Sequence, residues 1–454
     1  MQKTPAYLKC TQTENDMNIQ VIKNSEKDFR QKCRSVINLL RQGGLTSGPT
    51  AINIPTIVAD IIARVASRGD DALIEYEKQL DRVTLTSQAL RVPGDKIASV
   101  HRQAQPEFLS LMRRAIKNIR EYQQHIKISA PAPLRRGGRS LGVRYTPIER
   151  VGLYVPGGKA LYPSTVLMTA VPAQVAGVKE IVMVSPPNTD GDINPMVLAL
   201  AGELGITEVY RLGGAQAIAA LALGTQTIKP VQKIVGPGNA FVAEAKRKLF
   251  GKVAIDSVAG PSEVLILADE TADAKCIAAD MMAQAEHDPG SAILITTSEP
   301  LCKTVIDELA SQIKLLSRSD AIAASLEKYS AVILAADIDS ACELANDFAA
   351  EHLQIITADS HATLKKIRNA GAIFLGHYTP VPVGDYYAGP SHVLPTGGGA
   401  KCFSPLSVND FLKSSSIIEY DKKSLDEDKA DIFDFASREG LTAHAKSPMK
   451  RFEK

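Results

Sequence analysis

The chain has 454 residues, more than a single ordinary domain of roughly 100–200 residues would use. Charged residues make up 22% of it, near the usual quarter or so, and 45% are hydrophobic, enough for two or more buried cores. Because 52 basic side chains nearly balance 50 acidic ones, the composition gives no reason to expect disorder, or nucleic acid or an anionic membrane surface as a partner.

The cysteines and the apolar runs indicate the cellular compartment of the protein. Cysteines spaced too widely for a CxxC pair favour neither a thiolate zinc site nor a disulfide framework; they are Cys10, Cys33, Cys276, Cys302, Cys342 and Cys402. The segment Met1–Asn18 lacks the apolar centre of a signal peptide, and no run approaches the roughly 20 apolar residues of a membrane helix. We therefore expect a reduced, cytoplasmic protein.

Residues 1–130 are predicted to form a mainly helical N-terminal region. The motif Ile54-Pro55-Thr56 opens one helix with proline in its first turn, where a missing N–H costs little, and Gly69 ends it. A second helix is predicted from about Pro106, because apolar residues recur there at helical spacing. The segment SAPAPLRRGGRS, residues 129–140, is interpreted as a linker or exposed loop, whose arginines form a solvated edge or bind phosphate.

From Val151 the pattern changes to short apolar runs that alternate with helical patterns or Gly/Pro turns. Such strands are typical of parallel sheets covered on both faces. We predict an α/β fold with two Rossmann-like parallel-sheet domains, 131–250 and 251–395, which an ancient duplication could relate. Residues 396–454 would form a small helical tail that must pack on the body or on another subunit. The predicted strands are GLYV, EIVMV, EVYRL, KIV, SEVLIL, SAILIT, SAVILA, LQIIT and GAIFL.

A first group of candidate residues is suited to metal binding. Gln284 and His287 lie three apart near the end of a helix predicted from about Thr271 to Pro289-Gly290, so both project from one face. A histidine near a helix C-terminus equally suits a surface role, because its charge complements the helix dipole. The local sequence leaves both interpretations open.

Two later segments add polar candidates. Asp385 and His392 lie just beyond the strand GAIFL, and ligands gather at the carboxyl ends of strands in open α/β sheets. Glu439 and His444 lie in the tail, where an exposed histidine needs no functional explanation. Together with Gln284 and His287, Asp385 and His444 would offer oxygen and nitrogen donors that suit Zn²⁺, Mn²⁺ or Co²⁺. Common catalytic zinc sites do not use glutamine, so spacing alone does not establish the site.

The dipeptide Glu351-His352 stands immediately before an apolar strand. A carboxylate beside an imidazole can divide proton transfer, since histidine titrates near neutral pH and glutamate can activate water. Adjacent residues of a strand point to opposite faces, so the two can share a site only at a turn or strand edge. The dipeptide by itself is unspecific.

Nucleotide binding has a weaker signal, because no GxGxxG fingerprint follows any predicted strand. Three glycine turns could bring backbone close to a ligand: Gly157-Gly158, Gly213-Gly214 and Gly236-Pro237-Gly238-Asn239. The second and third precede predicted helices, and helix N-termini favour phosphate. Each is equally compatible with an ordinary tight turn.

In this order, the segments resemble the histidinol dehydrogenase family. The matching blocks cover most of the chain from about residue 145 to 446, and several are eight or more residues long. One departure is Ala349-Ala350 before Glu351, where Ala-Pro is expected. The blocks are LYVPGG, STVLMTAVPAQVAG, GGAQAIAALALGT, KIVGPGNAFVAEAKR, AGPSEVLILAD, AQAEHDP, EHLQI, GDYYAGPSHVLPT and LTAHAKS.

The resemblance implies an activity and a set of roles. It implies oxidation of L-histidinol to L-histidine, the last step of histidine biosynthesis, in two NAD-dependent steps through a bound aldehyde. It also implies a homodimer in which the tail, with Glu439 and His444, completes the neighbouring subunit's site. By motif, one Zn²⁺ per subunit would be held by Gln284, His287, Asp385 and His444, and NAD would contact Tyr154, Gln216 and Asn239. Ser262 and Glu439 would join the ligands of the substrate, with His392 nearby. Glu351 and His352 would be the acid–base pair.

The implied mechanism has definite rivals. His352 would accept the hydroxyl proton as hydride leaves to NAD, and Glu351 would activate water to hydrate the aldehyde. A metal-dependent hydrolase using Glu351 is one alternative, and a non-catalytic two-lobed binding protein is another. A third is a relative that acts on a different amino alcohol.

Overall fold

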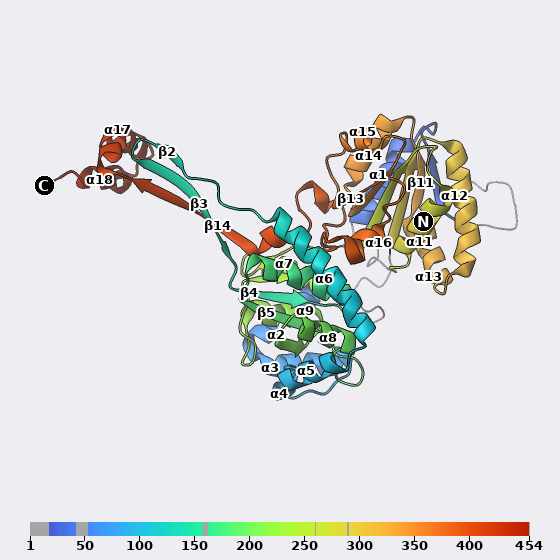
Figure 1. Cartoon of the computed structure of the whole chain (residues 1–454), viewed down its shortest axis with the longest axis horizontal. Helices are drawn as coiled ribbons and strands as arrows, with labels where there is room; N and C mark the ends of the chain where they lie inside the picture. The colour runs from blue at the N-terminus through green and yellow to red at the C-terminus, as the bar shows by residue number, and fades with distance from the viewer. Residues whose placement is uncertain (1–17, 42–52, 158–161, 259, 288–289, 454) are drawn as a thin grey trace.

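The computed structural model describes residues 18–41, 53–157, 162–258, 260–287 and 290–453. Cys10, Gly158 and Pro289, named above, lie outside these residues, as does nearly all of the segment Met1–Asn18. The described chain forms two α/β lobes and an arm that projects from the first lobe (Figure 1).

The first lobe is built on a parallel sheet with the strand order β6-β5-β4-β7-β8. Alternate residues of its strands point to opposite faces, so Met183 joins one core while Val182 and Val184 join the other. The strands are β4 (Arg150–Tyr154), β5 (Glu180–Ser185), β6 (Glu208–Arg211), β7 (Lys233–Val235) and β8 (Ala254–Ile255), with the helices α7 (Pro163–Ala176), α8 (Pro195–Glu203), α9 (Gly214–Leu223) and α10 (Ala240–Leu249).

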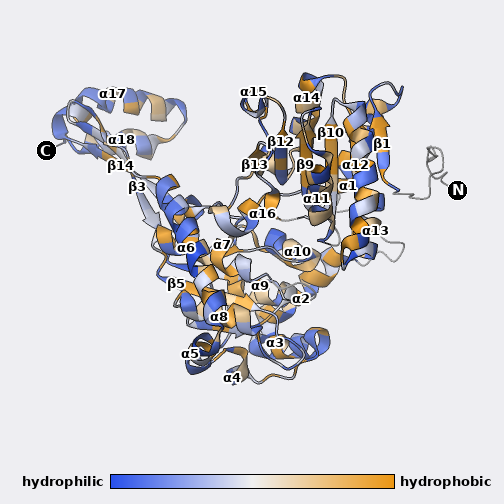
Figure 2. Ribbon diagram, turned by 45° about the vertical axis from the view of Figure 1, so that its right-hand side comes forward, coloured by the Kyte–Doolittle hydropathy of each residue, from blue (hydrophilic) through white to orange (hydrophobic). Residues whose placement is uncertain are grey.

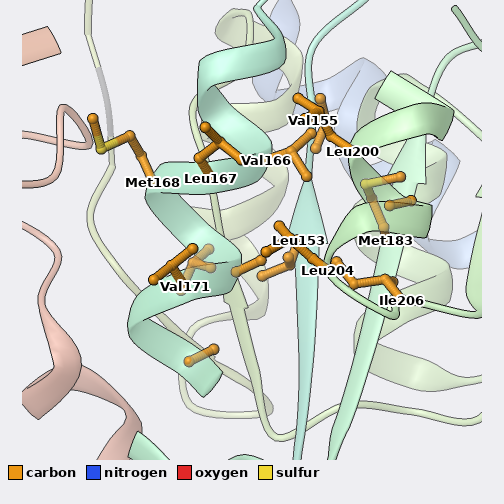
Figure 3. Close-up of a cluster of buried hydrophobic side chains, with 14 of the residues drawn as sticks. Leu153, Val155, Val166, Leu167, Met168, Val171, Met183, Leu200, Leu204 and Ile206 are labelled. Atoms are coloured by element: carbon orange, nitrogen blue, oxygen red, sulfur yellow. The ribbon is translucent and has the colours of Figure 1, made fainter. Parts of the chain in front are cut away.

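Helix α7 is apolar on nearly all sides and is therefore buried between the sheet and other helices. Its side chains Val166, Leu167 and Val171 lie beside Leu153 of β4 in the core (Figure 3). This packing holds the N-terminus of α7 at the carboxyl end of β4.

Helices from the N-terminal part of the chain cover both faces of the first sheet. Helix α2 begins at Ile54 with an Asn53 cap and ends before Gly69, and α6 begins at Pro106, as the sequence predicts. Helix α2 packs with α9 and α10, whereas α6 packs on α7. These elements are α2 (Ile54–Arg68), α3 (Asp70–Tyr76), the π-helical turn η1 (Glu77–Asp81), α4 (Ser87–Leu90), α5 (Gly94–Gln103) and α6 (Pro106–Ile126).

The second lobe has a parallel sheet with the strand order β1-β11-β10-β9-β12-β13. Figure 2 shows these strands as predominantly hydrophobic, since helices cover both faces. The strands are β1 (Gln20–Lys23), β9 (Ser262–Ala268), β10 (Gly290–Thr296), β11 (Ala331–Leu334), β12 (His352–Ile356) and β13 (Ala372–Leu375). Helices α11 (Ala274–Ala285), α12 (Glu299–Gln312) and α13 (Ser319–Tyr329) cover one face, and α1 (Phe29–Arg41) and α14 (Ile338–Phe348) the other.

The arm is an antiparallel sheet followed by two helices. In it β3 (Arg139–Pro147) lies between β2 (Leu134–Arg136) and β14 (Leu412–Tyr420), and α17 (Lys422–Arg438) and α18 (Thr442–Lys450) cap its far end (Figure 1). The prediction of a loop at 129–140 is therefore wrong from Leu134 onward, because β2 pairs with β3, and β3 in turn pairs with β14. Among its arginines, Arg139 forms ion pairs with Asp428 and Glu427 of α17.

Every apolar run predicted as a strand is a strand, and both main sheets are parallel. The N-terminal region is not purely helical, because β1 pairs with β11 and brings residues 18–41 into the second lobe. Likewise, β2 and β3 belong to the arm rather than to the first α/β domain. The domain boundaries near 250 and 395 stay a proposal. None of the described helices is long and apolar enough to cross a membrane.

Candidate active site

The strand order of the first sheet reverses between β4 and β7, which is where open α/β sheets bind ligands at their carboxyl ends. Tyr154 is the last residue of β4, and its buried hydroxyl accepts a hydrogen bond of 3.1 Å from the Gly214 N–H. Across the reversal, Asn239 follows β7 and caps α10 by accepting from the Phe241 and Val242 N–H groups at 3.0 and 3.1 Å. Two of the three residues proposed to contact NAD therefore flank this strand-order reversal.

Gln216, the third residue proposed to contact NAD, is held by an acid that the sequence analysis missed. Its Nε2 donates to Glu77 Oε1 at 3.1 Å, and the Gly213 N–H donates to the same oxygen at 3.4 Å. Glu77 is fully buried, and burial, reinforced by Asp81, raises its pKa to about 8. A π-helical turn carries Glu77, and such turns are frequent at functional sites, but no sequence motif marks it.

The acid–base candidates lie at the amino ends of strands, whereas the candidates for NAD contact in the first lobe lie at carboxyl ends. Ser262 begins β9 and His352 begins β12, so both stand at the amino ends of their strands, at the order reversal of the second sheet. In this lobe the candidate residues thus lie at amino ends, whereas the sequence favours ligands at carboxyl ends. Because Glu351 immediately precedes the strand, both members of the dipeptide can face one site, as the sequence analysis required.

A chain of short hydrogen bonds links α11 to Glu351. Gln284 Nε2 donates to Ser262 Oγ at 2.7 Å, and that hydroxyl donates to Glu351 Oε2 at 2.6 Å. Glu351 is buried, and burial raises the pKa of its carboxyl. The nearby imidazole of His352 lowers this pKa, but by less than burial raises it. Ser262 therefore joins a proposed metal ligand to the proposed water-activating carboxylate.

His352 is buried between carboxylates. Its Nδ1 lies 3.1 Å from the Glu263 carbonyl oxygen and 3.6 Å from Glu351 Oε2, while its Nε2 lies 3.4 Å from Asp385 Oδ1. Burial opposes the charged imidazole, but Glu351 and Asp385 outweigh it and raise the pKa of His352 to about 9. Within the described residues Nε2 has no well-aligned hydrogen-bond partner.

The first lobe contributes to the edge of this cluster. The ring of Tyr162, at the start of α7, stacks on His287 with centroids 6.5 Å apart and planes inclined by 16°. Thr165 Oγ1 lies 3.4 Å from His392 Nε2. The carboxyl end of the first sheet therefore faces the amino end of the second.

The donors fit a divalent ion in chemistry, but one chain does not supply the full set. Gln284 lies in the last turn of α11, which ends at Ala285 rather than near Pro289, and the His287 N–H donates to its carbonyl oxygen at 3.2 Å. His287 is exposed at the surface, yet the protein packed around its ring lowers its pKa by desolvation and so favours the neutral imidazole that metals bind; Asp385 opposes this shift. Within the described ranges, no three or more His, Cys, Asp or Glu side chains form a group able to hold a metal.

Glu439 and His444 are not part of this cluster within one chain. Both are exposed, Glu439 at the end of α17 and His444 in α18, at the far end of the arm (Figure 1). The structure thus brings together Gln284, His287, Asp385, Glu351, His352, Ser262 and His392, and leaves two proposed residues on the arm.

Comparison with known proteins places the chain in a family. The family profile described as histidinol dehydrogenase matches residues 47–452. Histidinol dehydrogenases from Rhodopirellula baltica and Geobacillus kaustophilus are 51% and 50% identical to the chain, each over 87% of it and over 86% and 93% of their own lengths. A crystal structure of histidinol dehydrogenase from Elizabethkingia anophelis superposes with a TM-score of 0.88 at 33% identity, covering 96% of this chain and 98% of that one.

The chain belongs to the histidinol dehydrogenase family. It is accordingly an oxidoreductase. Its departure from the Ala-Pro expected of the histidinol dehydrogenase family occurs where α14 ends. Ala349 adopts a left-handed conformation with φ of 52°, and its N–H donates to the Ala345 carbonyl oxygen at 2.9 Å. The turn that presents Glu351 thus forms with alanine at position 350.

Proposed function

We propose that the protein oxidises L-histidinol to L-histidine in two NAD-dependent steps through a bound aldehyde, as the last step of histidine biosynthesis. The supporting observation is the buried pair Glu351 and His352, whose hydrogen bonds leave one imidazole nitrogen directed at Asp385. Family membership names the substrate class, and the pair accounts for the proton transfers that such a reaction requires.

In this proposal His352 is the base that takes up the substrate's hydroxyl proton. The raised pKa of His352 keeps its imidazole protonated until the pH exceeds about 9; once the ring is neutral, donation from Nδ1 to the Glu263 carbonyl oxygen selects the tautomer in which Nε2 carries the lone pair. That nitrogen is buried, so water does not compete for it. After the first oxidation, Glu351 would deprotonate a water that adds to the aldehyde, and His352 would take the hydroxyl proton of the resulting hydrate.

The cofactor would bind at the carboxyl end of the first sheet, beside the strand-order reversal between β4 and β7. Tyr154, Gln216 and Asn239 are the residues proposed to contact it, Gln216 being held in place by Glu77. NAD supplies the hydride acceptor in each of the two steps, so one substrate molecule requires two cofactor molecules.

Gln284, His287 and Asp385, with His444 of the partner subunit, would hold the zinc ion, which supplies a Lewis acid that anchors and orients the substrate. Ser262 and the partner subunit's Glu439 would contact the substrate beside it. The arm supports a shared site, because it carries His444 away from its own cluster and exposes the apolar residues Ile418 and Phe435. Two identical arms would complete two identical sites in a homodimer.

A steady-state assay with L-histidinol and NAD tests the proposal. We expect two NADH for each histidine formed, and removal of the metal should abolish turnover until Zn²⁺ or Mn²⁺ is restored. His352→Asn should reduce kcat by about 10²–10⁴-fold while leaving metal content unchanged. Turnover without a nicotinamide cofactor would favour the hydrolase instead, and full activity in a verified metal-free preparation would contradict the ligand assignment.

The shared site has its own test in mixed dimers. Inactive His444→Ala and inactive His352→Asn chains, mixed under conditions that exchange subunits, should recover part of the activity. Recovery is expected because one of the two sites in each mixed dimer combines an intact base with an intact arm. No recovery after verified exchange would contradict the contribution of the arm in trans.

A further inference from the structure

Glu263, the second residue of β9, makes an unusual number of contacts with the dipeptide Glu351-His352. Its backbone N–H donates to Glu351 Oε2 at 3.1 Å, and its carbonyl oxygen lies 3.1 Å from His352 Nδ1. In return, its own side-chain Oε1 accepts from the Glu351 N–H at 3.1 Å. One residue thus contacts the backbone of Glu351 and the side chains of both members of the pair.

The same carboxyl oxygen also binds a distant loop. The Gly397 N–H donates to Glu263 Oε1 at 2.9 Å, so this oxygen joins two N–H groups from separate parts of the chain. The neighbouring Gly260 N–H donates to Thr396 Oγ1, which fixes the loop a second time. The loop that follows β13 and the start of β12 are therefore both held by hydrogen bonds to the same oxygen, Glu263 Oε1.

The Glu263 side chain has no counter-ion among the ion pairs of the described residues, although it is only 3% exposed. An ionised carboxylate buried without a cation is unfavourable, so the protonated acid is the expected form. Burial, together with the charge of Glu351, raises the pKa of Glu263 to about 8. A neutral carboxyl keeps its carbonyl oxygen as the acceptor for the two N–H groups.

We infer that the Glu263 carboxyl is a positioning residue that fixes Glu351 and His352 in their acid–base geometry by accepting the N–H groups of Glu351 and Gly397. Its effect on turnover rests on the proposed function, but its effect on the conformation of His352 does not. If the carboxyl withdraws, the Glu351 N–H loses its acceptor and the start of β12 shifts against β9. A shift of about 1 Å at reacting groups costs on the order of 10²-fold in rate.

Two replacements of Glu263 distinguish the effect of its hydrogen-bond acceptor from the effect of its charge. Glu263→Gln keeps a carbonyl oxygen at nearly the same place, whereas Glu263→Met keeps the length and loses the acceptor. With L-histidinol and NAD, we expect Glu263→Gln to retain kcat within about twofold and Glu263→Met to lose on the order of 10–100-fold. The KM for NAD and the zinc content should stay unchanged in both, because neither proposed site includes Glu263.

The conformation of His352 provides a readout independent of activity. Nitrogen-15 spectra of histidine-labelled protein, recorded above the raised pKa of His352 and assigned with His352→Asn, report which ring nitrogen of the neutral His352 carries the proton. Wild type and Glu263→Gln should share one tautomer, and Glu263→Met should lose this preference. Gln354→Met is the matched control, since it removes a different buried polar side chain, the amide of Gln354 on the adjacent strand β12, and should leave both the His352 signal and kcat unchanged.

If Glu263→Met does not fold, Glu263→Asp supplies the comparison, since it withdraws the acceptor by one methylene and keeps its chemistry. It should lower kcat and broaden the tautomer preference, and Glu263→Gln should not. A wild-type tautomer and kcat in folded Glu263→Met or Glu263→Asp would overturn the inference. An enzyme that does not oxidise histidinol would refute the proposed function alone, because the spectra would still test how Glu263 holds His352.

Discussion

Gly371 lies directly against the backbone of Glu351. A Cβ added at position 371 would stand 2.5 Å from the Glu351 carbonyl oxygen and 3.3 Å from its Cα. The Gly371 N–H donates to the Ala350 carbonyl oxygen at 2.9 Å, so the two segments cannot separate without losing this bond. The turn that presents the proposed acid therefore requires glycine at position 371 for close backbone approach.

Gly371→Ala should for this reason reduce turnover with L-histidinol by about tenfold or more, because Glu351 must move to accommodate the methyl group. The control is Gly94→Ala at the start of α5, where nothing lies within 4 Å of an added Cβ. That variant should keep wild-type kcat and gain a little stability. Equal kcat in the two variants would show that the turn tolerates a side chain.

The buried parallel strands could be predicted from the sequence because each is a short apolar run between turn residues, and every such run is a strand. The edge strands β1 and β8 were missed, since QVIK and AI lack a distinctive apolar pattern. The arm was missed because Pro, Gly and Arg dominate residues 129–140. Its strands are stabilised by β14, which follows far along the chain.

The site was only partly predictable. Gln284, His287, Glu351 and Asp385 belong to recognisable blocks, and the structure brings them together. Glu77 lies outside these blocks, and Glu263 lies within the block AGPSEVLILAD but carries no sign of a role of its own, because the roles of both acids depend on contacts with remote segments. The sequence does place Glu351-His352 directly before the strand β12, but it could not show that this amino end faces the carboxyl end of the first sheet, since the arrangement of the two lobes follows from contacts between remote segments.

The buried pair of Lys246 and Asp256 should stabilise the fold beside the proposed cofactor site. Lys246 Nζ binds Asp256 and also donates to the Gly236 carbonyl oxygen at 3.0 Å, while Asp256 Oδ2 accepts from the Gly236 N–H at 2.8 Å. Lys246→Met should cost about 3–5 kcal/mol in unfolding free energy, because it leaves an unpaired buried charge.

Chemical denaturation of Lys246→Met, Asp256→Asn and the double variant would measure this coupling. The double variant should be more stable than Lys246→Met, since it contains no unpaired charge. It should still raise the KM for NAD, because Gly236 leads into the turn that presents Asn239. Additive losses in the double variant would contradict the pairing.

Glu208 should make stability depend on pH in the acid range. Burial alone would raise the pKa of its carboxyl, but hydrogen bonds from Arg150 at 2.6 and 2.9 Å and from Tyr210 at 2.9 Å lower it. A folded-state pKa below the unfolded one adds stability that is present above the ordinary glutamate value and lost as pH falls through the folded value.

Glu208→Gln should therefore be less stable than wild type by about 1–2 kcal/mol near neutral pH. The difference should shrink as the pH falls below the pKa of the folded carboxyl, where wild type loses the same ion pair. Denaturation midpoints of both proteins at several pH values would measure it. A difference that stays constant into acid would show that the charge on Glu208 contributes nothing.

Arg139 should hold the helices of the arm in the orientation that the proposed shared site requires. Its guanidinium binds Asp428 at 2.6 Å and Glu427 at 3.2 Å, and lies 5.6 Å from the Tyr420 ring centroid. The pKa of Arg139 is raised, mainly by the hydrogen bond with Asp428, so the side chain stays charged at any accessible pH. Its ion pairs thus link β3 to α17.

Arg139→Met should loosen α17 and α18 on β3 and β14 while leaving both lobes intact. Amide hydrogen exchange should quicken in α17 and α18 and stay unchanged in β4 and β12. If His444 completes the partner's site, kcat should fall and zinc should bind more weakly, although no proposed ligand is altered. Arg136→Met, on the exposed β2 of the same hairpin, is the matched control and should change none of these. Faster exchange in the arm with unchanged zinc affinity would separate the arm from the metal site and would count against the shared site.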